Sequence, residues 1–183
     1  TFDFAGHGDS TRPFDRELLQ REIDAAYEFL VGQIEVDPTR IAIVGHSMGS
    51  GAVMEASLRN PERYAATVAI SPVGAEVTPL TPRTLQLQAG AWEAPFQANA
   101  ESLLERAGGS SDDFGNGRAR ELVVVPAADH LGILFRTPSH EAVKSWLDRA
   151  LSADPALRES YSDYRMLGWL LQVLGWMVVV SSM

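Results

Sequence analysis

A short apolar run at residues 41–44 ends at a glycine and passes directly into a helical pattern, and this break constrains the fold more than any other feature. The break has a G-x-S-x-G pattern, which reads Gly45-His46-Ser47-Met48-Gly49. Residues 40–44 are typical of a buried strand and residues 51–59 of a helix. A sharp strand-to-helix turn strains the residue at its apex and brings neighbouring segments together, so we expect that only glycine fits at both flanking positions.

Such a turn holds a serine hydroxyl clear of the backbone and beside a base, which makes the hydroxyl nucleophilic. Ser47 is therefore the candidate nucleophile, and the backbone amide of Met48 is a candidate donor to an oxyanion. Five-residue matches to this pattern also occur in ordinary loops. The strand before the motif and the helix after it favour the nucleophile.

A second motif supports the same interpretation and points to a family. Residues 3–10 resemble the D-x-x-G-H-G-x-S segment that follows the fourth strand of α/β-hydrolases, and residues 36–40 resemble the lead-in to their fifth strand. Over roughly residues 1–151 the chain thus resembles the α/β-hydrolase family. The resemblance implies an α/β fold, with a mostly parallel sheet covered by helices on both faces.

The remaining apolar pattern agrees with alternating strands and helices. Apolar residues recur at helical spacing over residues 16–34, with Asp15 as a plausible N-cap. Strands are expected at 65–70, 84–90 and 121–125, and helices at 95–107 and from Thr137, which we expect to cap the last one. This alternation predicts a parallel sheet between two helical layers.

The family's strand order, 1-2-4-3-5-6-7-8, implies that something precedes this chain. Residues 1–4 match the end of the fourth strand, so the third strand and the loop with the second oxyanion N–H would lie before Thr1. We therefore expect an N-terminally truncated domain. The 183-residue chain alone is expected neither to fold stably nor to hydrolyse esters, because its first complete strand would have an unpaired edge.

The resemblance also assigns the partners of the serine. The family order is Ser, then Asp or Glu, then His, and these positions match Ser47, Glu93 and His130. In the implied mechanism His130 takes the proton from Ser47, and Glu93 orients the imidazole and stabilises its charged form. Glu93 replaces the commoner aspartate and could be a solvated loop acid, and His130 could be a structural loop histidine.

Rival acids are less well placed. Asp112 and Asp113 precede a strand and should lie at the opposite edge of the sheet, about 20 Å away. Asp129 adjoins His130, and an immediate neighbour usually points its side chain elsewhere.

Other residues near the motifs have weaker assignments. Trp92 could line an acyl or leaving-group pocket, although packing is favoured. His7 and His46 are expected to brace the site, and His140 is expected to be an exposed helix residue.

Composition excludes several classes of function. A net charge of −9, without a cluster of Lys and Arg, argues against nucleic-acid binding. The absence of cysteine excludes disulfides and thiolate chemistry, and the four histidines have no ligand spacing. We therefore expect no metal, and the implied reaction needs no cofactor.

The C-terminal tail has a different composition. Residues 166–183 contain no charged side chain and approach the roughly 20 residues that cross a bilayer. They predict a transmembrane helix, joined by a linker over residues 152–165, and Arg158 and Arg165 favour a cytoplasmic hydrolase domain. The alternative is a buried terminal helix, which would need covering on every side.

Together these features predict a membrane-tethered serine hydrolase that cleaves an ester or related acyl bond of a small molecule through an acyl-enzyme intermediate. The fold alone does not separate esterases from peptidases or acyltransferases. The alternative is a non-catalytic membrane-tethered domain with the same fold, for which the glutamate in place of aspartate is the only support.

Overall fold

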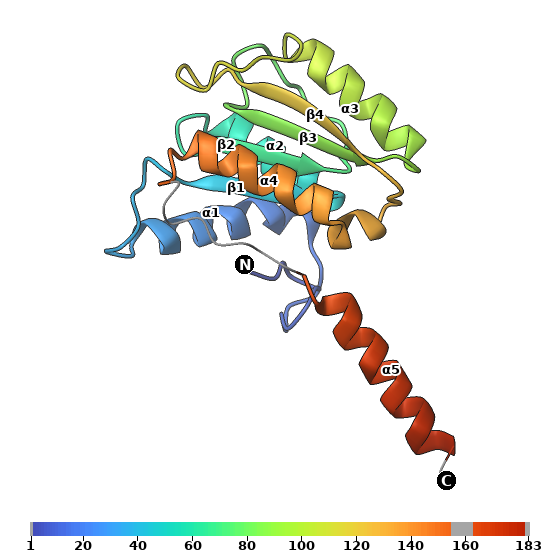
Figure 1. Cartoon of the computed structure of the whole chain (residues 1–183). Helices are drawn as coiled ribbons and strands as arrows, with labels where there is room; N and C mark the ends of the chain where they lie inside the picture. Colours follow the sequence, from blue (N-terminus) through green and yellow to red (C-terminus); the bar gives the residue numbers. More distant parts are fainter. Residues whose placement is uncertain (1, 155–162, 182–183) are drawn as a thin grey trace.

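The computed structural model describes residues 2–154 and 163–181, and its centre is a parallel sheet (Figure 1). The sheet has four strands in the order β1-β2-β3-β4, namely β1 (Ala42–His46), β2 (Ala66–Ile70), β3 (Leu85–Gly90) and β4 (Arg120–Val125). All three strand pairs are parallel. The predicted α/β-hydrolase fold, with a parallel sheet and helices, is thereby confirmed.

Helices cover both faces of the sheet. They are η1 (Arg16–Leu18), α1 (Leu19–Val31), α2 (Met48–Arg59), α3 (Ala94–Arg106), η2 (Gly132–Phe135) and α4 (Thr137–Ala150). On one face α2 and α3 pack on β2 and β3, and α1 packs on α2. On the other face α4 crosses the sheet (Figure 1). The central strands therefore lie between two helical layers, and because all strand pairs are parallel the loops after the strands meet at one edge.

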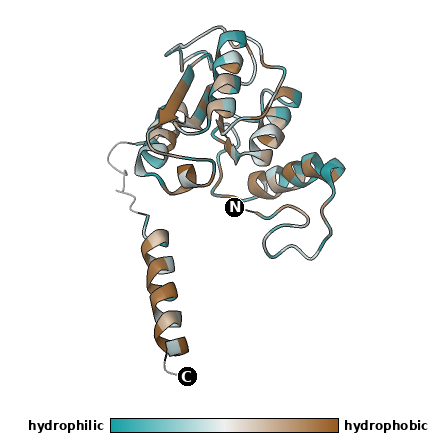
Figure 2. Ribbon diagram, turned by 90° about the vertical axis from the view of Figure 1, so that its right-hand side faces the viewer, coloured by the Kyte–Doolittle hydropathy of each residue, from teal (hydrophilic) through white to brown (hydrophobic). Residues whose placement is uncertain are grey.

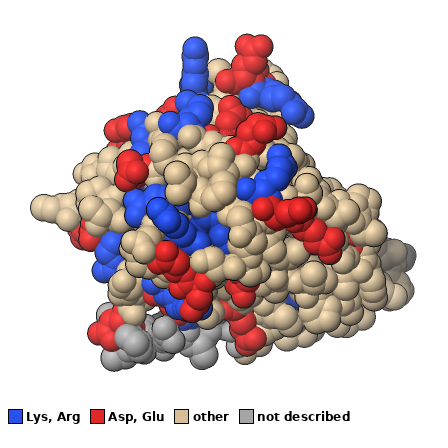
Figure 3. All heavy atoms as spheres, turned by 90° about the horizontal axis from the view of Figure 1, so that it is seen from above, with Lys and Arg blue, Asp and Glu red and all other residues tan. Residues whose placement is uncertain are grey.

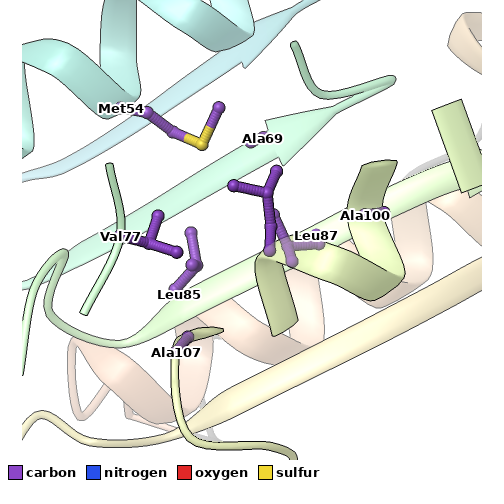
Figure 4. Close-up of a cluster of buried hydrophobic side chains, with 8 residues drawn as sticks. Met54, Ala69, Val77, Leu85, Leu87, Ala100 and Ala107 are labelled. Carbon is purple, nitrogen blue, oxygen red and sulfur yellow. The ribbon is translucent and has the colours of Figure 1, made fainter. Parts of the chain in front are cut away.

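Alternation along the strands divides the core between these two layers. Ala69 and Leu87 belong to a cluster with Met54 of α2 and Leu103 of α3 (Figure 4). Val68, the neighbour of Ala69, faces the opposite cluster around Trp146 of α4. Each large apolar side chain buried in this way stabilises the fold by roughly 1.5–3 kcal/mol.

Polar side chains attach α4 to the sheet. Gln86 and Gln88 are fully buried on β3, although alternation predicts a solvent face for polar residues in a half-buried strand. Gln88 Oε1 accepts a hydrogen bond from Ser139 Oγ at 2.7 Å, and its amide nitrogen donates to Ser139 O at 3.3 Å. Trp146 Nε1 donates to Thr84 O at 3.2 Å. These bonds fix α4, and therefore the loop before it, relative to β3.

Two boundary expectations are corrected. Residues 2–4, which were expected to match the end of a strand, form no strand. In the part of the chain that is described, β1 lies at an edge of the sheet. Thr137 does not cap α4, because the N-cap is Arg136 and makes no side-chain capping bond. Asp15 does act as predicted, since its carboxylate accepts a hydrogen bond from Glu17 N at the start of η1.

The expected transmembrane helix is also corrected. The tail forms α5 (Arg165–Ser181), an apolar helix of 17 residues drawn in brown in Figure 2. Within residues 2–154 and 163–181 no helix is long and apolar enough to cross a membrane. The predicted transmembrane span at 166–183 and the membrane localisation, with its cytoplasmic hydrolase domain, are therefore wrong.

Contacts at the first turns of α5 connect it to η2. Arg165 donates to Leu134 O at 2.8 Å, and the Trp169 ring meets the Phe135 ring edge-to-face at 5.2 Å. Much of the predicted linker, residues 155–162, lies outside the described residues.

Candidate active site

Ser47 occupies the junction between β1 and α2 in a strained backbone conformation. Its φ is 55° and its ψ −118°, a left-handed region that few non-glycine residues adopt. A Cβ on Gly45 would lie 2.2 Å from the carbonyl oxygen of Gly49, so glycine is required at position 45. A Cβ on Gly49 would meet nothing within 4 Å. The expectation that both flanking positions need glycine therefore holds only for Gly45.

The structure brings Ser47, His130 and Glu93 into one hydrogen-bonded chain. His130 Nε2 lies 2.8 Å from Ser47 Oγ, and His130 Nδ1 lies 2.6 Å from Glu93 Oε1. Ser47 follows β1, Glu93 follows β3 and His130 follows β4. The carboxyl ends of parallel strands meet at one edge of the sheet, which explains how side chains far apart in sequence come together.

The Glu93 side chain is almost fully buried and makes hydrogen bonds to three different residues. Its residue is 4% exposed. Its Oε2 accepts hydrogen bonds from the Gly90 amide at 2.6 Å and from Ser71 Oγ at 2.9 Å, while Oε1 faces His130. These donors replace the hydrogen bonds to water that the carboxylate loses on burial.

Two residues that support Glu93 were not found by sequence reasoning. Ser71 follows β2, has a φ of 47° and is completely buried. A Cβ on Gly90 would lie 2.3 Å from Ala128 O and 2.9 Å from Glu93 Oε2, so only glycine lets the two loops approach. Only their position could have indicated this role in the sequence, because both residues lie at the carboxyl ends of strands.

Two rings lie against the His130 imidazole. Phe96, in the first turn of α3, stacks on it with centroids 4.6 Å apart and an interplanar angle of 15°. His46, the last residue of β1, lies 4.7 Å away at 38°. His46 Nε2 also lies 2.8 Å from the His130 carbonyl oxygen. Burial lowers the pKa of His46 below its ordinary value of 6.5, which favours its neutral form.

The remaining predicted site residues differ in their placement. Met48 is the first residue of α2, where an amide has no carbonyl partner within the helix and can donate outward. Trp92 is 70% exposed and is not among the residues that line the cavity beside Ser47, so it takes part in neither the pocket nor the packing that the sequence suggested.

The rival acids face other partners. Asp129 Oδ1 accepts from the Gly132 amide at 2.6 Å and so turns away from the His130 ring. Asp112 pairs with Arg149, and Asp113 accepts from Asn116, in the loop before β4.

The other two histidines contact backbone carbonyls. His7 Nδ1 lies 3.0 Å from Ala5 O, and His140 Nε2 lies 2.9 Å from Leu134 O. His140 is partly buried, not exposed as expected.

A cavity of about 490 Å³ opens beside Ser47. Mainly apolar side chains line it, among them Phe2, Phe4, Ile23, Ile43, Met48 and Val53, together with His7 and His46. A larger cavity of about 900 Å³ lies along α4 and contains none of the three hydrogen-bonded residues. The larger cavity is therefore not the one beside the three hydrogen-bonded residues.

The remaining features to consider are clusters of possible metal ligands and the distribution of surface charge. In the described ranges, no group of three or more His, Cys, Asp or Glu residues could hold a metal ion. Acidic and basic side chains are intermingled on the face shown in Figure 3.

Fold and sequence together define the class of protein. Residues 1–179 match the model of the Alpha/beta hydrolase family, and the chain belongs to that family. Among solved structures, NosK from Streptomyces actuosus is similar in fold, with a TM-score of 0.56, 16% identity, and coverage of 81% of this chain and 84% of that one.

Two particular relatives come from Mycobacterium tuberculosis. The uncharacterized proteins Rv2307c of strain H37Rv and MT2364 of strain CDC 1551 are each 32% identical to this chain over 136 residues. The match covers 70% of this chain and 47% of each relative, so the chain spans about half the length of the curated relatives it matches. Their names state no activity.

Proposed function

We propose that this chain carries the active site of a serine hydrolase that cleaves an ester or related acyl bond of a small molecule. The observation that carries the proposal is the hydrogen-bonded chain from Ser47 Oγ through His130 to Glu93, with bonds of 2.8 and 2.6 Å. The strained backbone of Ser47 between β1 and α2 supports its identity as the nucleophile of an elbow. Membership of a hydrolase family agrees with this class of reaction.

The first half of the reaction forms an acyl-enzyme. Ser47 Oγ attacks the substrate carbonyl carbon while its proton passes to His130 Nε2. The tetrahedral intermediate then collapses, the bond to the leaving alcohol breaks, and His130 gives its proton to that alcohol. The Met48 amide, at the positive end of α2, donates to the oxyanion.

The second half releases the acid. Water loses a proton to His130 as it attacks the acyl carbon, and the proton returns to Ser47 Oγ as the acyl–enzyme bond breaks. Glu93 accepts a hydrogen bond from His130 Nδ1–H throughout, which keeps the proton on Nδ1 and leaves the Nε2 lone pair free to receive the serine proton. With the Gly90 amide and Ser71 hydroxyl as further donors, the carboxylate is preorganised for the imidazolium.

The surroundings of Ser47 favour a substrate with an apolar group. Phe4, Met48 and Val53 line the cavity that opens beside the nucleophile. An acyl or alkyl chain of moderate size would fit a cavity of about 490 Å³. No resident cofactor enters this scheme.

The rival proposal is a non-catalytic domain that keeps the fold. Its sequence support was the glutamate in place of aspartate, but Glu93 reaches His130 at 2.6 Å and is anchored by two further donors. This geometry favours the enzyme.

Hydrolysis of p-nitrophenyl esters by the protein as its gene encodes it separates the two proposals. Ser47→Ala should abolish turnover, and Ser102→Ala, at an exposed position on α3, should leave it unchanged. Equal turnover by the wild type and Ser47→Ala would contradict the proposed hydrolase. So would the absence of turnover by all three proteins with p-nitrophenyl esters of every acyl chain length.

A further inference from the structure

His46 links the strand that carries the nucleophile to the loop that carries the histidine. It is the last residue of β1 and directly precedes Ser47. Its Nε2 lies 2.8 Å from the His130 carbonyl oxygen, and a carbonyl can only accept, so Nε2 carries the proton and donates. A single side chain thus connects the two backbone segments whose side chains exchange a proton.

The loop after β4 needs such a link because its backbone is irregular. Ala127 has a φ of 49°, and the loop turns sharply before η2. Ala128 O accepts from the Trp92 amide at 3.0 Å, and Asp129 O accepts from the Ile133 amide at 3.0 Å. The next carbonyl along the loop, that of His130 itself, is held by His46.

The surroundings of His46 favour a donor and not a second base. Its Nε2 is directed to the His130 carbonyl and not to Ser47 Oγ, which bonds to His130 Nε2. Its ring also lies against the His130 ring, on which Phe96 of α3 stacks as well. The two rings and the carbonyl bond together restrict rotation and displacement of the imidazole.

We propose that His46 is a positioning residue that fixes His130 through the bond from its Nε2–H to the His130 carbonyl. The proposal rests on the proposed function, since it assigns a role within the same site. A misplacement of catalytic groups by about 1 Å can cost about 100-fold in rate. Loss of the donor should therefore lower kcat more than it changes KM, because the lost bond orients His130, although His46 also lines the cavity beside Ser47.

Three substitutions separate the donor from the ring. His46→Gln places an amide nitrogen near the position of Nε2 and keeps the donor, whereas His46→Phe keeps a planar ring and removes it. His46→Asn keeps an amide but is one methylene too short to reach the carbonyl. His140→Phe, which removes a similar histidine-to-carbonyl bond beside η2, is the control for a purely structural loss.

The closing experiment combines ester kinetics with proton NMR of the downfield His130 Nδ1–H resonance, which reports the bond to Glu93. We expect His46→Gln to stay within about 3-fold of wild-type kcat, and His46→Phe and His46→Asn to lose about 10- to 100-fold in kcat with a smaller change in KM. The downfield resonance should persist in His46→Gln and broaden in the other two. Because Gln and Asn are similarly polar, this pair remains informative if the Phe variant does not fold.

The outcomes distinguish the two levels of the proposal. Equal kcat and an unchanged resonance in Gln, Asn and Phe variants would overturn the positioning role while leaving the hydrolase intact. A loss in all three, equalled by His140→Phe, would also overturn it, because the effect would then be structural. The predicted change of the resonance in a protein without Ser47-dependent turnover would support the positioning of His130 and reject the proposed hydrolase.

Discussion

Replacing the Glu93 carboxylate by an amide tests the hydrogen-bonded chain at its least exposed member. Glu93→Gln keeps the shape of the side chain but replaces one acceptor oxygen by a donor NH₂. The Gly90 amide lies 2.6 Å from Oε2 and can only donate, so the amide oxygen must take the Oε2 position. The NH₂ group then faces His130 Nδ1, at the position from which Oε1 accepts at 2.6 Å.

The consequence follows from the tautomer of His130. With a donor opposite Nδ1, the ring must carry its proton on Nε2 and can no longer take a proton from Ser47. In serine proteases the corresponding change of aspartate to asparagine leaves the geometry intact and lowers kcat about 10⁴-fold. We expect a loss of about the same size here, equivalent to roughly 5 kcal/mol of transition-state stabilisation.

The assay is steady-state p-nitrophenyl ester hydrolysis by the protein as encoded, with thermal melting to verify the fold. Glu101→Gln makes the same change at an exposed position on α3 and should retain full turnover. If Glu93→Gln retains near wild-type turnover while Asp129→Asn loses it, the assignment of the acid is wrong. In the structure the Asp129 carboxylate accepts a hydrogen bond from the Gly132 amide instead.

Three further predictions concern the support of the site and the fold. Gly90→Ala should lower both turnover and stability, the latter by about 1–3 kcal/mol in urea denaturation, because its Cβ would lie 2.3 Å from Ala128 O; wild-type values would show that the loops can separate freely. Leu87→Ala, at a fully buried position, should lower the free energy of unfolding by about 2–5 kcal/mol, and a loss below 1 kcal/mol would contradict the packing of β3. Burial lowers the pKa of His46, so its contribution to stability is present above pH 6.5 and is lost as pH falls through the lowered pKa. Melting temperatures should therefore fall below pH 6.5 less steeply in His46→Gln than in wild type, and parallel curves would refute this.

Much of the fold follows from local patterns in the sequence. Strands and helices alternate with clear apolar periods, and this alternation is sufficient for a parallel sheet between helical layers. The carboxyl-end rule and the family order of the triad also place Glu93 and His130 near Ser47, and the distances of 2.6 and 2.8 Å agree with that expectation. Their catalytic roles stay a prediction.

The supporting residues could not be predicted because their signals are not local. Ser71 resembles any serine after a strand until its bond to Glu93 Oε2 is known. Phe96 resembles a packing residue of α3, and its stacking on His130 depends on how α3 sits on the sheet. For Trp92 the sequence predicted a packing or pocket role that the structure does not show, since this residue beside Glu93 is 70% exposed.

The tail shows why a count of apolar residues can mislead. Residues 166–183 contain no charge, yet within the described residues α5 (Arg165–Ser181) is not long and apolar enough to cross a membrane.

The most direct test of the central claim identifies the residue that becomes acylated. The protein as encoded is treated with a fluorophosphonate, which reacts only with an activated serine, and the modified peptide is located by mass spectrometry. We expect one modification, on Ser47, at a rate that falls steeply in His130→Ala and is unchanged in Ser102→Ala. Modification of a different serine, or labelling of Ser47 that does not depend on His130, would contradict it.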